Sequence, residues 1–338
     1  FAAQVSGWIE ANPAAFGVNW ACTMDVAIRA VNWLWAYHAL AGSPALTDDF
    51  LLRFEKSLLA HGRHILGNLE RSGRVTHNHY LSDLVGLATL GMLCPEFREA
   101  ARWRDFALRE LWREMEKQVH PDGVDFEAAV SYHRLVTESF LVPVLLCRRQ
   151  GIAVPDAVMG RLERMIEFVL HCTRPDGGAP SFGDCDNGRL LRLKAWDGDE
   201  REWSDHRHLL AAGAVLFRRD DFGRAAGGEW EEAFWLLGAS AVRFKEALDA
   251  SAGPAPEPGS RLFPDGGLCF LRGGGSYVAV DAGGVGQGGA GGHAHNDTLG
   301  FEFACARRPW LVDPGSGVYT ADFETRNRLR SSRAHPVL

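Results

Sequence analysis

Over residues 1–248, apolar residues recur every three or four positions between short polar or Gly/Pro turns. This is the pattern of helices that bury one face. Thr23 and Thr47 are predicted N-caps, Gly42 a helix stop and Pro95 a first-turn residue. The predicted helices cover residues 24–40, 47–69, 78–92, 95–119, 130–149, 155–173, 205–218 and 229–237. Short turns favour helical hairpins, and many hairpins in one chain form a solenoid or a closed toroid. The sequence has no repeat of fixed period, which disfavours the solenoid.

The composition changes after residue 248. Residues 249–260 read DASAGPAPEPGS, a linker rich in Pro, Gly and Ala. Short β-rich pieces follow and predict strands over 268–272, 277–281, 299–304 and 310–312, with a hairpin connection at 306–309. The sequence therefore predicts a helical domain over 1–248, a linker over 249–261 and an antiparallel β domain over 262–338. So few strands cannot close a β-sandwich, and we expect the β domain to be truncated.

Composition and charge narrow the classes of protein. The chain is 46% hydrophobic and 23% charged, which is typical of a globular protein. Its 36 basic and 43 acidic residues give a net charge of −7, which argues against a nucleic-acid binder. No apolar run is long enough to predict a membrane span. Seven cysteines without CxxC pairs predict reduced, mostly buried thiols. The chain begins at Phe1 without Met, so we expect a fragment.

Polar clusters lie at three turns. Residues 77–80 read HNHY at the start of a predicted helix, where Asn78 is either an ordinary N-cap or a functional residue. Residues 121–134 read PDGVDFEAAVSYHR, a turn that leads into a helix with Tyr, His and Arg on its first turns. Residues 184–189 read DCDNGR, which has the start of a calcium loop without its distal Glu. A turn rich in acids is the simpler interpretation, in which Asp184 or Asp186 could still contact substrate or hold an arginine.

The segment at 291–297 reads GGHAHND and leads into a predicted strand. Two histidines at alternate positions of extended backbone point to one face. His and Asp are common zinc ligands, so His295 is a candidate ligand together with Asp313 and His335, which only the fold could bring near it. The alternative is a loop that its own side chains hydrogen-bond.

Residues 326–333 contain four arginines in an otherwise acidic chain. Guanidinium groups match the geometry of carboxylates and sulfates, which favours recognition of an anionic ligand. A solvated edge is the alternative.

Together and in this order, these segments resemble the heparinase II/III-like polysaccharide lyases, which include heparin-sulfate lyases and oligoalginate lyases. The matching segments are NWACTMDVAIRAVNWLW (19–35), HNHYLSDLVGLATLG (77–91), HPDGVDFEAAVSYHRLV (120–136), GDCDNGRL (183–190), GGHAHNDTLGFEF (291–303), LVDPGSGVYT (311–320) and RNRLRSSRAH (326–335). The resemblance implies a multidomain fold, α then β: an incomplete α/α toroid of helical hairpins followed by an antiparallel β-sandwich domain. It also implies β-elimination beside a uronic acid, which leaves a 4,5-unsaturated sugar.

The resemblance assigns roles in this reaction. Asn78 would neutralise the uronate carboxylate and stabilise the enolate-like intermediate. His79 would be the base or a second neutralising group. Tyr132 would either abstract the C5 proton or protonate the leaving O4. An unperturbed tyrosine titrates near 10, so the base role would need a nearby cation such as Arg134. His293 matches the histidine that the β domain contributes.

The resemblance also implies a structural zinc ion held by His295, Asp313 and His335. The expected partner is an acidic polysaccharide or oligosaccharide, and the expected location is the bacterial periplasm, with the cytoplasm as the alternative. The residues predicted to bind substrate are Arg134, Glu127, Arg189, Arg326 and Arg330.

Two other functions fit parts of the pattern. A glycoside hydrolase on a helical toroid would use two carboxylates, for which Asp125, Glu127, Asp184 and Asp186 are available. A hydrolase mechanism would not explain why Asn78, His79, Tyr132 and His293 occur together. A glycan-binding relative without catalysis is the other alternative.

Overall fold

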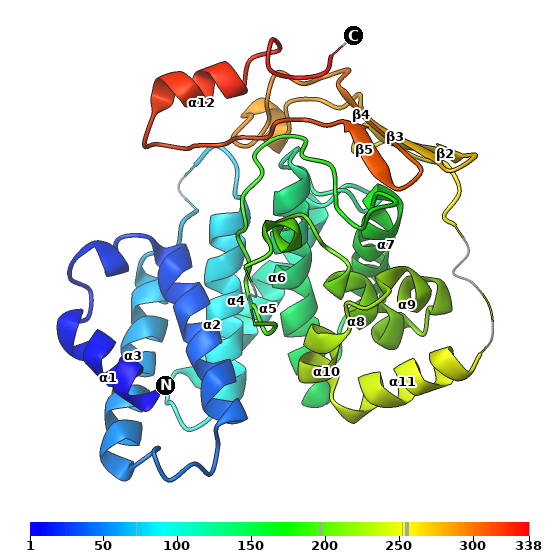
Figure 1. The fold of residues 1–338 in the computed structure, drawn as a ribbon. Helices are drawn as coiled ribbons and strands as arrows, with labels where there is room; N and C mark the ends of the chain where they lie inside the picture. Colours follow the sequence, from blue (N-terminus) through cyan, green and yellow to red (C-terminus); the bar gives the residue numbers. More distant parts are fainter. Residues whose placement is uncertain (72, 196–197, 252, 254–256, 338) are drawn as a thin grey trace. The chain divides into compact units, whose positions relative to one another are not determined.

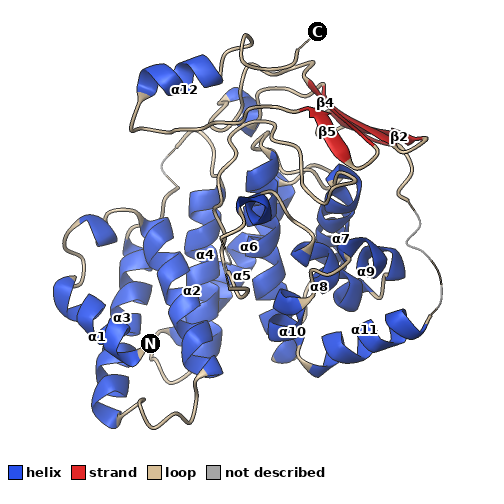
Figure 2. Cartoon of the chain, viewed as in Figure 1, coloured by secondary structure: helices blue, strands red, loops and turns tan. Residues whose placement is uncertain are grey.

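The computed structural model describes residues 1–71, 73–195, 198–251, 253 and 257–337. Helices come first and an antiparallel sheet second, which confirms the predicted order (Figures 1 and 2). The helices are α1 (Ala2–Ala11), α2 (Thr23–Ala39), α3 (Asp48–Gly67), α4 (Asn78–Leu93), α5 (Ala100–Gln118), α6 (Val130–Arg149), α7 (Asp156–Cys172), α8 (His208–Phe217), α9 (Asp220–Ala226), α10 (Glu231–Leu237), α11 (Ala239–Ala250) and α12 (Phe323–Leu329). The strands are β1 (Arg261–Phe263), β2 (Leu268–Gly273), β3 (Ser276–Asp281), β4 (Phe301–Cys305) and β5 (Arg308–Leu311).

The chain forms two compact units. One comprises residues 1–115 and 139–154, and the other comprises residues 116–138 and 155–338. The domain boundaries predicted at residues 248 and 261 remain a prediction. Of the predicted linker, residues 252 and 254–256 lie outside the described residues.

In the first unit, α4 is buried along almost its whole length, and its buried residues are mostly apolar but include Asp83. It packs closely against α2. An added Cβ at Gly86 of α4 would lie 2.7 Å from the Ala27 Cβ of α2 and 2.9 Å from its Cα. The glycine thus allows a close approach between the two helix backbones.

In the second unit, the strands form a meander in the order β1 to β5, and every neighbouring pair is antiparallel. Alternate residues of the strands face a core that includes Phe270, Tyr277 and Ala304 from the sheet and Phe168 from α7. The Tyr277 hydroxyl donates a 2.7 Å hydrogen bond to the carbonyl of Cys172, so it is satisfied although it is buried.

Some helix boundaries match the prediction and others differ from it. Thr47 caps α3 as expected, with its hydroxyl accepting from the Phe50 amide at 3.3 Å. Cys22, not Thr23, is the N-cap of α2, because the Thr23 hydroxyl donates to the Asn68 carbonyl instead. Pro95 begins a series of turns, and α5 starts only at Ala100.

The helices and strand that the sequence did not predict are α1, α9, α11, α12 and β1. They are short, and the formation of short elements depends on tertiary packing.

The connection predicted at 306–309 is shorter in the structure. Ala306 and Arg307 form the turn with positive φ values of 52° and 62°, the geometry of a two-residue hairpin turn. Pro309 lies in β5, at the edge of the described sheet, where a missing N–H is tolerated.

We predict that Gly86→Ala destabilises the protein by about 1–3 kcal/mol, because the new methyl group overpacks against Ala27. The matched control is Gly7→Ala in α1, where an added Cβ meets nothing within 4 Å. That change should stabilise by about 0.5–1 kcal/mol through helix propensity. Urea unfolding of both variants measures the difference, and equal stabilities would contradict the close packing of α2 on α4.

Candidate active site

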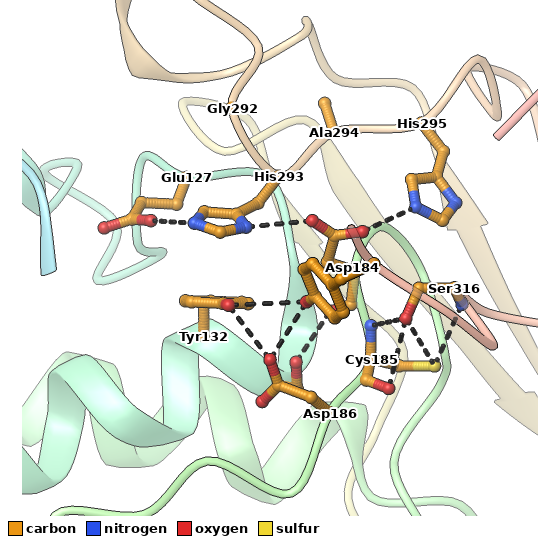
Figure 3. Close-up of polar contacts among 12 residues, drawn as sticks. Glu127, Tyr132, Asp184, Cys185, Asp186, Gly292, His293, Ala294, His295 and Ser316 are labelled. Carbon is orange, nitrogen blue, oxygen red and sulfur yellow. Dashed lines mark hydrogen bonds and ion pairs between the residues drawn. The ribbon is translucent and has the colours of Figure 1, made fainter. Parts of the chain in front are cut away.

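The Asp184 carboxylate lies at the centre of a polar cluster in the second unit (Figure 3). One oxygen lies 2.9 Å from His293 Nδ1, and the other lies 3.0 Å from His295 Nε2. The Arg326 guanidinium donates to both oxygens, at 3.0 and 2.9 Å. Burial raises the pKa of Asp184, but these hydrogen bonds outweigh it and hold the pKa well below its usual range. The carboxyl is therefore ionised and accepts from all three partners.

The backbone around Gly183 fixes the position of Asp184. The Asp184 amide donates to the His293 carbonyl at 2.8 Å, and the Gly183 amide donates to Asp297 Oδ2 at 3.0 Å. Gly183 has a φ of +71°, and an added Cβ would lie 2.5 Å from the Ala128 carbonyl oxygen. Only glycine fits this position.

His293 lies between two carboxylates. Because Asp184 is ionised, Nδ1 of His293 carries the proton of their hydrogen bond. The other ring nitrogen, Nε2, lies 3.4 Å from Glu127 Oε2. Gln287 braces both sides of this pair: its Nε2 donates to Glu127 at 3.1 Å, and its Oε1 accepts from the Gly292 amide at 3.0 Å. The orientation of the ring is thus fixed, with Nδ1 on Asp184 and Nε2 facing Glu127.

Tyr132 stacks on His293, with ring centroids 3.7 Å apart and an interplanar angle of 21°. Its hydroxyl donates to Asp186 Oδ2 at 2.9 Å and lies 3.3 Å from the Tyr319 hydroxyl, which donates to the same oxygen at 2.9 Å. Burial and the negative charge of Asp186 raise the pKa of Tyr132 above its usual range. Tyr132 is therefore a neutral phenol near pH 7 and can give up a proton rather than take one.

Arg134 does not support the base role of Tyr132. Its side chain is buried, and its guanidinium donates to the carbonyls of Trp203, Asp186 and Gly188. It holds the 186–188 turn in place, whereas the pKa of Tyr132 is raised, not lowered. The condition set for a base role, a cation such as Arg134 that lowers the pKa of Tyr132, is therefore not met, and the burial of Arg134 gives no support to direct contact with substrate.

The other predicted substrate contacts also have protein partners. Arg189 pairs with Glu138 and Glu232. Arg330 donates to the Ala294 carbonyl at 3.3 Å. Arg326, besides its bond to Asp184, lies over the Tyr319 ring at 4.4 Å. Glu127 is fully buried beside His293. The structure shows these side chains in contact with other residues of the same chain, and their roles in binding substrate remain predictions.

The predicted metal ligands come together. Because the Asp313 carboxylate lies 2.7 Å from His335 Nδ1, that nitrogen donates and leaves the lone pair on Nε2. In the same way, Asp184 accepts the hydrogen bond of His295 Nε2, which leaves the lone pair of His295 on Nδ1. Both of these remaining nitrogens are buried and have no hydrogen-bond partner among the described residues.

Donor atoms of His295, His335 and Asp297 lie within 4.8 Å of one another. The set suits a zinc ion. Asp297 was missed by the sequence reasoning, although it follows His295 by two residues in the same segment. Asp313 was predicted as a ligand. In the structure its carboxylate accepts from Nδ1 of His335 and so orients that ring.

Asn78 and His79 belong to the first unit and lie on the first turn of α4. His77, not Asn78, is the N-cap: its Nδ1 accepts from the His79 amide at 3.5 Å. Asn78 is buried. Hydrogen bonds with Cys22 and Glu70 raise the pKa of His79 to about 10. A protonated His79 favours the neutralising role over the role of base.

Models of one protein family match most of the chain. Residues 1–197 match the model of the heparinase II/III N-terminus, and residues 255–338 match the heparinase II/III-like C-terminal model. The chain belongs to the heparinase II/III family. It is similar to a heparin-sulfate lyase of Pedobacter heparinus, with 25% identity over 99% of this chain and 47% of the relative. A heparin-sulfate lyase of Bacteroides stercoris is 29% identical over 54% of this chain and 26% of that protein.

Solved structures have the same fold. A crystal structure of heparinase III aligns with a TM-score of 0.69 at 19% identity, over 99% of this chain and 50% of that one. The heparan sulfate lyase HepC from Pedobacter heparinus aligns with a TM-score of 0.63 at 24% identity, over 99% and 48%. The likeness confirms the predicted fold class. The chain spans about half the length of these heparinases.

Two other expectations concern the chain as a whole. The seven cysteines form no disulfide in the described structure, and Cys94, Cys147 and Cys172 are buried. Within the described ranges, no helix is long and apolar enough to cross a membrane.

The ion pairs around Glu138 give a prediction about acid stability. Burial alone would raise the pKa of Glu138. The interactions with Arg189 and His208 have the larger effect and lower the pKa from 4.5 to about 2. A depressed carboxyl pKa stabilises the fold above pH 4.5, and this stabilisation is lost as the pH falls towards about 2. Glu138→Gln should therefore flatten the acid limb of the stability profile and cost about 3–5 kcal/mol at pH 7, because Arg189 loses a buried partner.

Urea unfolding at a series of pH values between 2 and 7 measures this effect. Glu246→Gln, at an exposed position of α11, is the control and should follow the unchanged protein. An acid limb of unchanged slope in Glu138→Gln would contradict the lowered pKa.

Proposed function

We propose that this chain carries the reacting groups of a polysaccharide lyase that cleaves a uronate-containing glycosaminoglycan by β-elimination. The observation that supports it most is Tyr132 stacked on His293, with its hydroxyl on Asp186. A proton donor and a proton acceptor then lie side by side, as an elimination requires. The heparin-sulfate lyases among the relatives support a sulfated, uronate-containing substrate.

We assign each residue one role in this reaction. His293 Nε2 removes the proton from C5 of the uronate. The electron pair forms the C4–C5 double bond as the C4–O4 bond breaks, and the Tyr132 hydroxyl protonates the departing O4. Asp184 keeps His293 in the tautomer that this step needs. Asp186 aligns the Tyr132 hydroxyl. By resemblance, Asn78 donates a hydrogen bond to the uronate carboxylate.

We propose a zinc ion at His295, Asp297 and His335, with Asp313 orienting His335. The support is the pair of buried lone-pair nitrogens that no described residue satisfies. The ion would brace the segment that carries His293 and would take no part in the proton transfers. A bacterial, periplasmic enzyme with alginate as another possible substrate remains a prediction.

Tyr132→Phe should reduce kcat by about 10²- to 10⁴-fold with little change in KM, because it removes the general acid but leaves the ring stacked on His293. The measurement is the ultraviolet absorbance of the unsaturated uronate over a panel of heparan sulfate, heparin and alginate. Tyr37→Phe in α2 is the matched control and should keep full activity.

Two outcomes would contradict these roles. Full turnover by Tyr132→Phe would show that another group protonates O4. New reducing ends without absorbance would identify a hydrolase instead of a lyase.

His335→Ala should lower the zinc content by about one equivalent per chain, and chelation should lower the Tm of the unchanged protein. Elemental analysis and thermal unfolding measure these effects without any assay of activity. His38→Ala, at the end of α2, is the control and should keep its zinc. An unchanged zinc content in His335→Ala would overturn this assignment of the ligands.

A further inference from the structure

A second group of metal-ligating side chains lies in the first unit. Cys22, Glu70 and His79 each offer one donor atom, and these atoms lie within 4.8 Å of one another. The Glu70 Oε1 atom is 3.2 Å from His79 Nδ1, and Glu70 Oε2 is 4.0 Å from the Cys22 sulfur. All three residues are partly exposed. A thiol, a carboxylate and an imidazole so close together are the donors that zinc takes from proteins.

The surrounding backbone holds these donors in place. The Met24 amide donates to Glu70 Oε2 at 2.9 Å, and the Glu70 amide donates to Asp83 Oδ2 at 2.8 Å. The Thr23 hydroxyl bonds to the Asn68 carbonyl at 2.8 Å, which ties the start of α2 to the segment that carries Glu70. Since Gly86 lets α2 and α4 approach closely, Cys22 and His79 lie on the ends of two firmly packed helices. Outer hydrogen bonds of this kind orient metal ligands.

A buried carboxyl group lies beside the cluster, and burial raises its pKa to about 8. Asp83 is fully buried, and one of its oxygens bonds to the Glu70 amide. Its other oxygen has no hydrogen-bond partner among the described residues. A positive charge at the neighbouring cluster would offset the cost of burying this acid.

We propose that Cys22, Glu70 and His79 bind a divalent cation of the zinc class. With three protein ligands and partly exposed side chains, the ion would keep a coordination position for water or an anionic ligand, unlike a closed structural site. The thiol and the imidazole bind in their deprotonated forms, so binding releases protons, and the bound ion replaces the proton that His79 otherwise carries. The inference concerns the first unit alone and does not depend on the proposed lyase activity.

Cobalt substitution tests the proposal, because a cobalt ion bound by a thiolate gives a charge-transfer band in the near ultraviolet. The protein is stripped with a chelator under reducing conditions and titrated with Co²⁺ alone. We expect this band in the unchanged protein. Cys22→Ser should lose the band and about one equivalent of bound metal. Cys269→Ser, a partly buried thiol of β2, is the matched control and should keep both.

His335→Ala separates this site from the histidine site of the second unit. It should keep the charge-transfer band, because the histidine site contains no thiol. Absence of the band from the unchanged protein would overturn the proposal, even if Cys22→Ser failed to fold. A band that survives in Cys22→Ser, with circular dichroism unchanged, would overturn it as well.

Discussion

The buried charge of Asp184 is the interaction on which the site in the second unit depends. An ionised carboxyl removed from water is costly unless it is paired and fully hydrogen-bonded. Here Arg326 supplies the opposite charge and two hydrogen bonds, while His293 and His295 supply one each. The same carboxylate therefore orients two imidazole rings: it accepts from Nδ1 of His293 and from Nε2 of His295, which leaves the lone pair of His295 on Nδ1.

This arrangement links the acid–base group to the metal-ligand group through one side chain. Asp184 lies between His293 and His295 as Figure 3 shows, so a displacement of either ring changes the bond to the other. Asp186, two residues further on, aligns the hydroxyls of Tyr132 and Tyr319. Because the short segment around Gly183 is tied to the His293 carbonyl and to Asp297, both acids are placed by the same backbone.

The sequence predicted the order of elements and the turns that carry the polar clusters, because helical periodicity and Gly/Pro punctuation are local signals. It also left open that Asp184 or Asp186 would contact substrate or hold an arginine. It could not predict that Arg326 is this arginine, since 142 positions separate Arg326 from Asp184. Gln287 and Tyr319 were missed for the same reason: neither lies in a pattern that sets it apart, and only the fold brings them to Glu127 and Asp186.

The position of the arginines changes how an anionic substrate must be held. A cluster of arginines in an acidic chain suggests a docking surface for carboxylates or sulfates, yet Arg189 and Arg326 already pair with buried acids. Removing either arginine would leave an uncompensated carboxylate, so a loss of binding in such a variant would not distinguish contact with the substrate from disturbance of the site. Arg326 cancels the charge of Asp184, which would otherwise repel a uronate approaching His293. Under the proposed function, Arg326 thus aids binding by neutralising the protein instead of by direct contact with the substrate.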